Sequence, residues 1–91
     1  MFKRISPQKV QHSTGYFVQV LDRETIEYID GGTHVTVQVD FGPTVGVYKQ
    51  TLRKLERDGG QSGLLSEDDR ERFFGRIVDG LNAMGCAVEI C

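Results

Sequence analysis

The chain of 91 residues has no tryptophan, two cysteines and two prolines. It also has no apolar run near the roughly 20 residues that a membrane-spanning helix needs. The first residues, MFKRISPQK, lack the apolar core of a secretory signal peptide. Cys86 and Cys91 fit a reducing compartment, and their spacing is not that of a CxxC redox or zinc motif. These absences predict a cytoplasmic protein with no membrane segment.

The charge balance excludes a large class of functions. Eleven Lys and Arg residues stand against thirteen Asp and Glu residues, which gives a formal net charge of −2. A general nucleic-acid-binding domain needs a basic surface that displaces counterions, so we expect no nucleic-acid partner. The charges are uneven along the chain, because residues 49–57 are mainly basic whereas residues 22–40 contain five acids against one arginine. These segments are either ordinary solvated faces or one side of an interaction between surfaces of opposite charge.

The longest organised segment, residues 66–85 (SEDDRERFFGRIVDGLNAMG), has the pattern of an amphipathic helix. Ser66 is a good N-cap, acidic residues follow it in the first turn, and Gly85 suits the end of a helix. Gly80 lies at the edge of the apolar stripe, where its missing side chain would let the helix approach a sheet closely. The stripe spans an arc of roughly 140°, as expected for a helix that faces a core, and its members are Phe73, Phe74, Ile77, Val78, Leu81 and Met84.

Strand patterns precede this helix. Residues 16–21 and 25–30 are rich in β-forming side chains, and Gly31-Gly32 fits a two-residue hairpin turn. Residues 33–41 alternate strictly, which predicts a strand with one buried face and one face toward water or a partner. The expected buried side chains are Val35, Val37, Val39 and Phe41, and the expected outward ones are His34, Thr36, Gln38 and Asp40. Shorter strands are predicted at residues 9–12, 45–48 and 86–91.

The segment between the strands and the long helix is predicted to contain a short helix and a loop. Leu52 and Leu55, three positions apart, favour a helix over residues 51–57, and the three glycines of residues 58–63 favour a loop. The order of elements predicts a single α+β domain over residues 1–91. We expect a mainly antiparallel sheet of four to five strands, with the long helix packed on one face and a final C-terminal strand.

The sequence has no recognisable catalytic or ligand-binding motif. His12 and His34 are not in a metal-ligand spacing, and the glycines near residue 60 lack the lysine of a phosphate-binding loop. We therefore expect no catalytic residues, no metal, no cofactor and no enzymatic activity. A weaker hypothesis is a small enzyme or ligand binder that uses His34 with neighbouring acids.

Residues 48–56, YKQTLRKLE, resemble the central segment of the immunity protein 74 family, bacterial proteins predicted to neutralise polymorphic toxins. Tyr48, Thr51 and Glu56 fall at matching places, and so do the acidic helix start (SEDD) and the GCAVEI ending. The resemblance covers roughly residues 16–91. Leu55 stands where the family has a tryptophan, so a partner contact through that position would differ in this chain.

The resemblance implies inhibition of a toxin by direct binding, without catalysis. Together with the acidic stretch, it gives six candidate residues for binding a protein partner: Glu24, Glu27, Asp30, Asp40, Tyr48 and Glu56. The alternative is a structural module that assembles with itself, as a homodimer, through an exposed strand edge.

Overall fold

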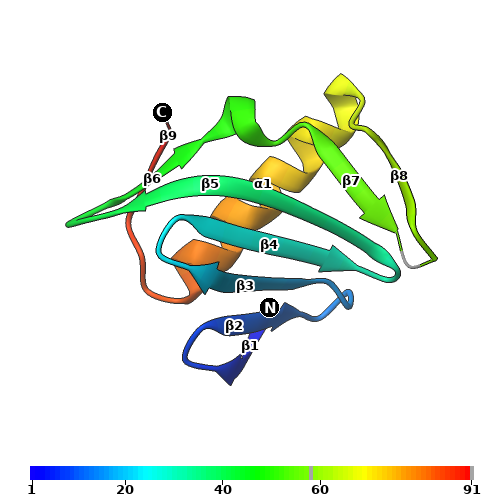
Figure 1. The fold of residues 1–91 in the computed structure, drawn as a ribbon. Helices are drawn as coiled ribbons and strands as arrows, with labels where there is room; N and C mark the ends of the chain where they lie inside the picture. Colours follow the sequence, from blue (N-terminus) through cyan, green and yellow to red (C-terminus); the bar gives the residue numbers. More distant parts are fainter. Residues whose placement is uncertain (58, 91) are drawn as a thin grey trace.

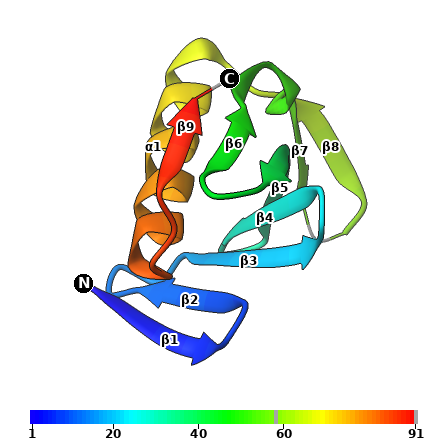
Figure 2. The ribbon, with the colours of Figure 1, turned by 90° about the vertical axis from the view of Figure 1, so that its left-hand side faces the viewer.

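The computed structural model describes residues 1–57 and 59–90, and within them it contains one α-helix and one strongly curled sheet of nine strands (Figure 1). The helix, α1 (Glu67–Ala83), lies along one face of the sheet (Figure 2). The strands are β1 (Phe2–Ser6), β2 (Lys9–His12), β3 (Phe17–Asp22), β4 (Thr25–Asp30), β5 (Thr33–Phe41), β6 (Val45–Tyr48), β7 (Lys54–Arg57), β8 (Gln61–Leu64) and β9 (Val88–Ile90).

The sheet is organised around β5, the longest strand. One side of β5 pairs with β4, and its other side is shared by β6, which pairs with residues 38–41, and β7, which pairs with residues 33–35. The main strand order is β1-β2-β3-β4-β5-β6-β9, and β8 extends the branch through β7. In the described ranges every pairing is antiparallel except that of β6 with β9. The predicted α+β class is confirmed, but the prediction of four to five strands is too low.

The predicted short helix over residues 51–57 is wrong. A single 3-10 turn, η1 (Lys49–Thr51), is followed by strand β7. Leu52 is fully buried, and Leu55 pairs with Val35 on β5, so an open strand edge determines the structure where the spacing of two leucines suggested a helix. Part of the predicted loop forms β8; Gly59 and Gly60 have positive φ in the turn before it, and residue 58 lies outside the described residues.

Two terminal strands also differ from the predictions. Residues 2–6 form β1, which the sequence pattern did not indicate because most of its side chains are exposed. The last strand is shorter than the predicted residues 86–91, since β9 begins at Val88 and residue 91 is outside the described part of the chain.

The core lies between α1 and the inner face of the sheet, which we define as the face toward α1. The sheet contributes Val10, Val18, Ile26, Tyr28, Val35, Val37, Val39, Val45 and Val47, and the helix contributes Phe73, Phe74, Ile77 and Leu81. The close approach predicted at Gly80 is confirmed, because a Cβ built there would lie 2.7 Å from the Cβ of Val18.

Both predicted ends of α1 are confirmed. The backbone N–H of Asp69 donates to Ser66 Oγ at 3.1 Å, which satisfies one of the free N–H groups of the first turn. Gly85, with φ of 91°, follows the last helical turn. Among the described residues, no helix has the length and apolar character needed to cross a membrane.

Candidate partner-binding surface

The outer face of the sheet, which turns away from α1, carries a polar network on its central strands. Gln19, Glu27 and Thr36 lie in register across β3, β4 and β5. Gln19 Nε2 donates to Glu27 Oε1 at 2.6 Å, and His34 Nδ1 lies 3.5 Å from Glu27 Oε2. The side chain of Glu27 is 18% exposed. Its carboxylate therefore belongs to an intramolecular network, with part of its surface open to solvent.

A shallow hollow on the outer face brings together three of the six predicted residues, Glu24, Asp40 and Tyr48. It has a volume of about 190 Å³ and is also lined by Gln38 and Val39. The hollow forms because Gln38 pairs with Tyr48 across β5 and β6, and because the Val39 N–H donates to the Glu24 carbonyl at 2.8 Å. Glu24 and Asp40 are exposed and Tyr48 is half-buried. Two carboxylates and a phenol thus converge on one surface.

The other three predicted residues lie elsewhere. Glu56 is opposite His34 in the pairing of β7 with β5, at the other end of the outer face. Glu27 is the member of the network described above. Asp30 lies on the inner side, where its carboxylate accepts from Tyr28 Oη at 2.9 Å and from Arg76 Nη1 at 3.1 Å. The structure therefore separates Asp30 from the hollow and places it in contact with the helix.

An apolar hollow lies at the same end of the sheet, on its inner side. Its volume is about 490 Å³, and it is lined by Gln8, Val20, Asp22, Arg23 and Phe41. The two hollows lie on opposite sides of the same end of the sheet, since residues 23 and 41 line the inner one and their chain neighbours 24 and 40 line the outer one. We call the residues Glu24, Asp40, Tyr48 and Phe41 the acidic end of the sheet.

Phe41 was expected to be buried, but it is 40% exposed. The alternation of β5 does direct it to the same side as Val35, Val37 and Val39. It is exposed because it lies at the last position of β5, next to the apolar hollow. A sequence pattern can indicate the side to which a residue points, but not whether another element covers it.

A cluster centred on Arg76 of α1 was not predicted. Arg76 Nη1 donates to Tyr28 Oη at 2.7 Å, and its guanidinium lies 4.9 Å from the centroid of the Tyr16 ring. Burial raises the pKa of Tyr28 to about 12, and burial also raises the pKa of Tyr16. At neutral pH Tyr28 is therefore protonated and can donate to Asp30, so the cluster connects α1 to the end of β4.

No group of three His, Cys, Asp or Glu side chains within residues 1–57 and 59–90 is placed to hold a metal ion. Cys86 is a half-buried free thiol, whereas Cys91 lies outside the described residues. Comparisons of the chain with family models, with curated proteins and with solved structures gave no match.

Proposed function

We propose that this chain is a small bacterial binding protein of the immunity type, which acts in the cytoplasm and neutralises a toxin by direct binding. The proposal includes no catalytic step. The observation that carries it is the acidic end of the sheet, where exposed carboxylates and two aromatic side chains lie beside two hollows, one on each side of the sheet. The resemblance of residues 48–56 to the immunity protein 74 family agrees with this choice, since Tyr48 belongs to both.

The acidic end has the composition of a protein-binding surface. Interface cores are enriched in aromatic side chains, and their rims are polar and accessible to solvent. On the outer side Tyr48 provides the aromatic part and Glu24 and Asp40 provide the rim, and Phe41 adds an aromatic side chain at the hollow on the inner side. Burial of the exposed part of Phe41 by a partner would stabilise the complex by about 25 cal/mol per Å² of apolar area.

The charges at this end favour a basic partner. Asp22, Glu24 and Asp40 surround the hollows, against one cation, Arg23. Charges attract across a distance of about 8 Å at physiological ionic strength, so these carboxylates would speed the approach of a basic surface and orient it. The expected partner surface carries Lys or Arg side chains around a protruding apolar residue.

Growth of cells that co-express the chain with a candidate toxin, the product of a neighbouring toxin-like reading frame, tests the proposal. The wild-type chain is expected to restore growth, and Glu24→Gln combined with Asp40→Asn is expected to protect less well. Glu67→Gln combined with Asp68→Asn is the matched control, because it makes the same charge change at exposed positions at the start of α1. Full protection by the Glu24 and Asp40 variant would contradict the proposed surface.

A further inference from the structure

The described part of the sheet ends in three strands that pair on one side only, β1, β8 and β9. Natural sheets protect such edges with charged side chains, bulges and short strands. β1 carries Lys3 and Arg4 and has an irregular register between Arg4 and Ser6, and β9 has three residues, one of them Glu89. β8, with the sequence QSGL, is also short, with four residues, but it has no charged side chain and no irregular register with β7. It is the least protected of the three edges.

The ladder between β7 and β8 defines which backbone groups are available at this edge. The N–H of Leu65 donates to the carbonyl of Arg53 at 2.8 Å, so these two residues form a hydrogen-bonded pair. Such pairs alternate along an antiparallel ladder, so Gly63 bonds to Leu55, its register partner. The N–H and C=O groups of Ser62 and Leu64 therefore point to the open edge, where they can bind another strand.

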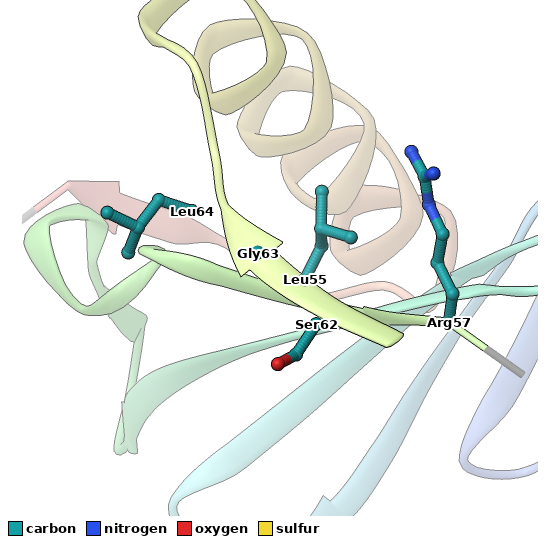
Figure 3. Close-up of a pocket in the computed structure, with 5 residues that line it drawn as sticks. All are labelled: Leu55, Arg57, Ser62, Gly63 and Leu64. Carbon is teal, nitrogen blue, oxygen red and sulfur yellow. The ribbon is translucent and has the colours of Figure 1, made fainter. Parts of the chain in front are cut away.

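A hollow of about 220 Å³ lies at this edge and is lined by Leu55, Arg57, Ser62, Gly63 and Leu64 (Figure 3). The side chains of Leu55 and Arg57 lie on the side of α1, whereas the Ser62 hydroxyl points to the other side. Because Gly63 has no side chain, Leu55 is reached from the edge; a Cβ built on Gly63 would meet nothing within 4 Å. Leu64 is 79% exposed. The hollow thus fits an apolar side chain from an added strand.

Basic side chains lie near both ends of the free edge. Arg57 is exposed and is the register partner of Gln61, on the side of Leu55. Lys54 is exposed, is the register partner of Leu64, and lines a second hollow of about 230 Å³ with Ser62 and Gly63. The only acid on β7, Glu56, lies opposite Ser62. A strand added to β8 would therefore meet positive charge at its two ends and negative charge between them.

We propose that β8 binds an extended acidic segment of a partner protein, which adds to the sheet as an antiparallel strand. In this register an apolar residue lies opposite Gly63 and packs against Leu55. The residue before it lies opposite Leu64, beside Lys54, and the residue two places after it lies opposite Gln61, beside Arg57. The geometry thus specifies the pattern acid–apolar–neutral–acid.

This site is independent of the function proposed above. β7 pairs with the first residues of β5, whereas the acidic end lies at the last residues of β5. The two surfaces also differ in chemistry, since the acidic end favours a basic partner and β8 favours an acidic segment. A second copy of this chain is a poorer occupant, because the QSGL strand carries no carboxylate to place beside Lys54 or Arg57.

Titration of the isotope-labelled protein with two synthetic peptides, followed by NMR of its amide groups, tests the inference. The acidic peptide TTEVTETT has the specified pattern, and TTKVTKTT is its matched basic control. We expect the acidic peptide alone to shift the amide signals of Ser62, Gly63 and Leu64. Leu64→Pro removes one outward N–H group. It should weaken binding of the acidic peptide about fivefold relative to Leu64→Ala, because this factor corresponds to the free energy of about one hydrogen bond.

A second variant keeps the test informative if proline disrupts the hairpin. Gly63→Val adds a strand-forming side chain in open space, fills the hollow and leaves the outward backbone groups in place. It is expected to weaken binding of the acidic peptide by more than tenfold. Equal binding of both peptides, no shifts at millimolar peptide, or undiminished binding to Gly63→Val would overturn the inference. A dimer that Leu64→Pro dissociates would also overturn it, because β8 would then bind a second copy.

Discussion

Gly80→Ala is expected to destabilise the protein, although alanine is the better helix former. A Cβ at residue 80 would lie 2.7 Å from both Cβ and Cγ2 of Val18 and 3.1 Å from its Cγ1, whereas carbon atoms pack best at about 3.5–4.0 Å. Val18 is fully buried, so α1 must move away from β3. Overpacking of this kind costs about 1–3 kcal/mol, against about 1 kcal/mol gained by replacing glycine in a helix. The expected net loss of unfolding free energy is therefore up to about 2 kcal/mol.

Gly75→Ala is the matched control in the same helix. Its Cβ would meet nothing within 4 Å, and the residue is exposed, so it should gain about 1 kcal/mol. Both variants gain the same helix propensity, so this gain cancels when their unfolding free energies are subtracted. The remaining difference is the cost of the contact with Val18, about 1–3 kcal/mol. Urea unfolding followed by circular dichroism measures both stabilities. A Gly80→Ala protein as stable as Gly75→Ala would refute the argument that Gly80 is required for the close approach.

Three other changes follow from the described contacts. Ser66→Ala removes the N-cap of α1 and should lower the unfolding free energy by about 1 kcal/mol. Ser62→Ala is the control and should stay within about 0.5 kcal/mol of wild type; thermal unfolding measures both. Arg76→Ala leaves Tyr28 Oη and the Asp30 carboxylate without their charged donor and should cost about 1–3 kcal/mol in urea unfolding. Burial raises the pKa of Tyr28 from 10.0 to about 12, so the stability that depends on its protonated form is complete below pH 10 and is lost as the pH rises toward 12. The melting temperature of the wild-type protein should therefore fall over this pH range, and Tyr28→Phe should make the fall smaller.

The sequence was sufficient for elements that depend on local patterns. The hairpin turn at Gly31-Gly32, the alternation of β5, and the N-cap of α1 each follow from a few neighbouring residues. The strands β7 and β8 could not be predicted in this way. β7 forms because β6 covers only part of one edge of β5, and this vacancy appears only when the sheet is assembled.

The sequence named candidate residues but not their arrangement. Glu24, Asp40 and Tyr48 were individually identified, but their convergence depends on the pairing of β5 with β6, which brings residues 38 and 48 together. The separate position of Asp30 had a signal in the sequence, since alternation in β4 places it on the side of Tyr28. The partner of Asp30, Arg76, is 46 residues away in the chain, so no local pattern indicates it.

The most direct test of the acidic end as the partner surface is a quantitative pull-down with the immobilised protein and a low-salt wash. The prey is a lysate of the source cell that contains the toxin-like product. Wild type and the Glu67→Gln, Asp68→Asn control should retain one stoichiometric partner equally. The Glu24→Gln, Asp40→Asn variant should retain it with roughly fivefold lower affinity, as expected for the loss of two exposed charge pairs. Equal retention of that partner by all three proteins would contradict the account.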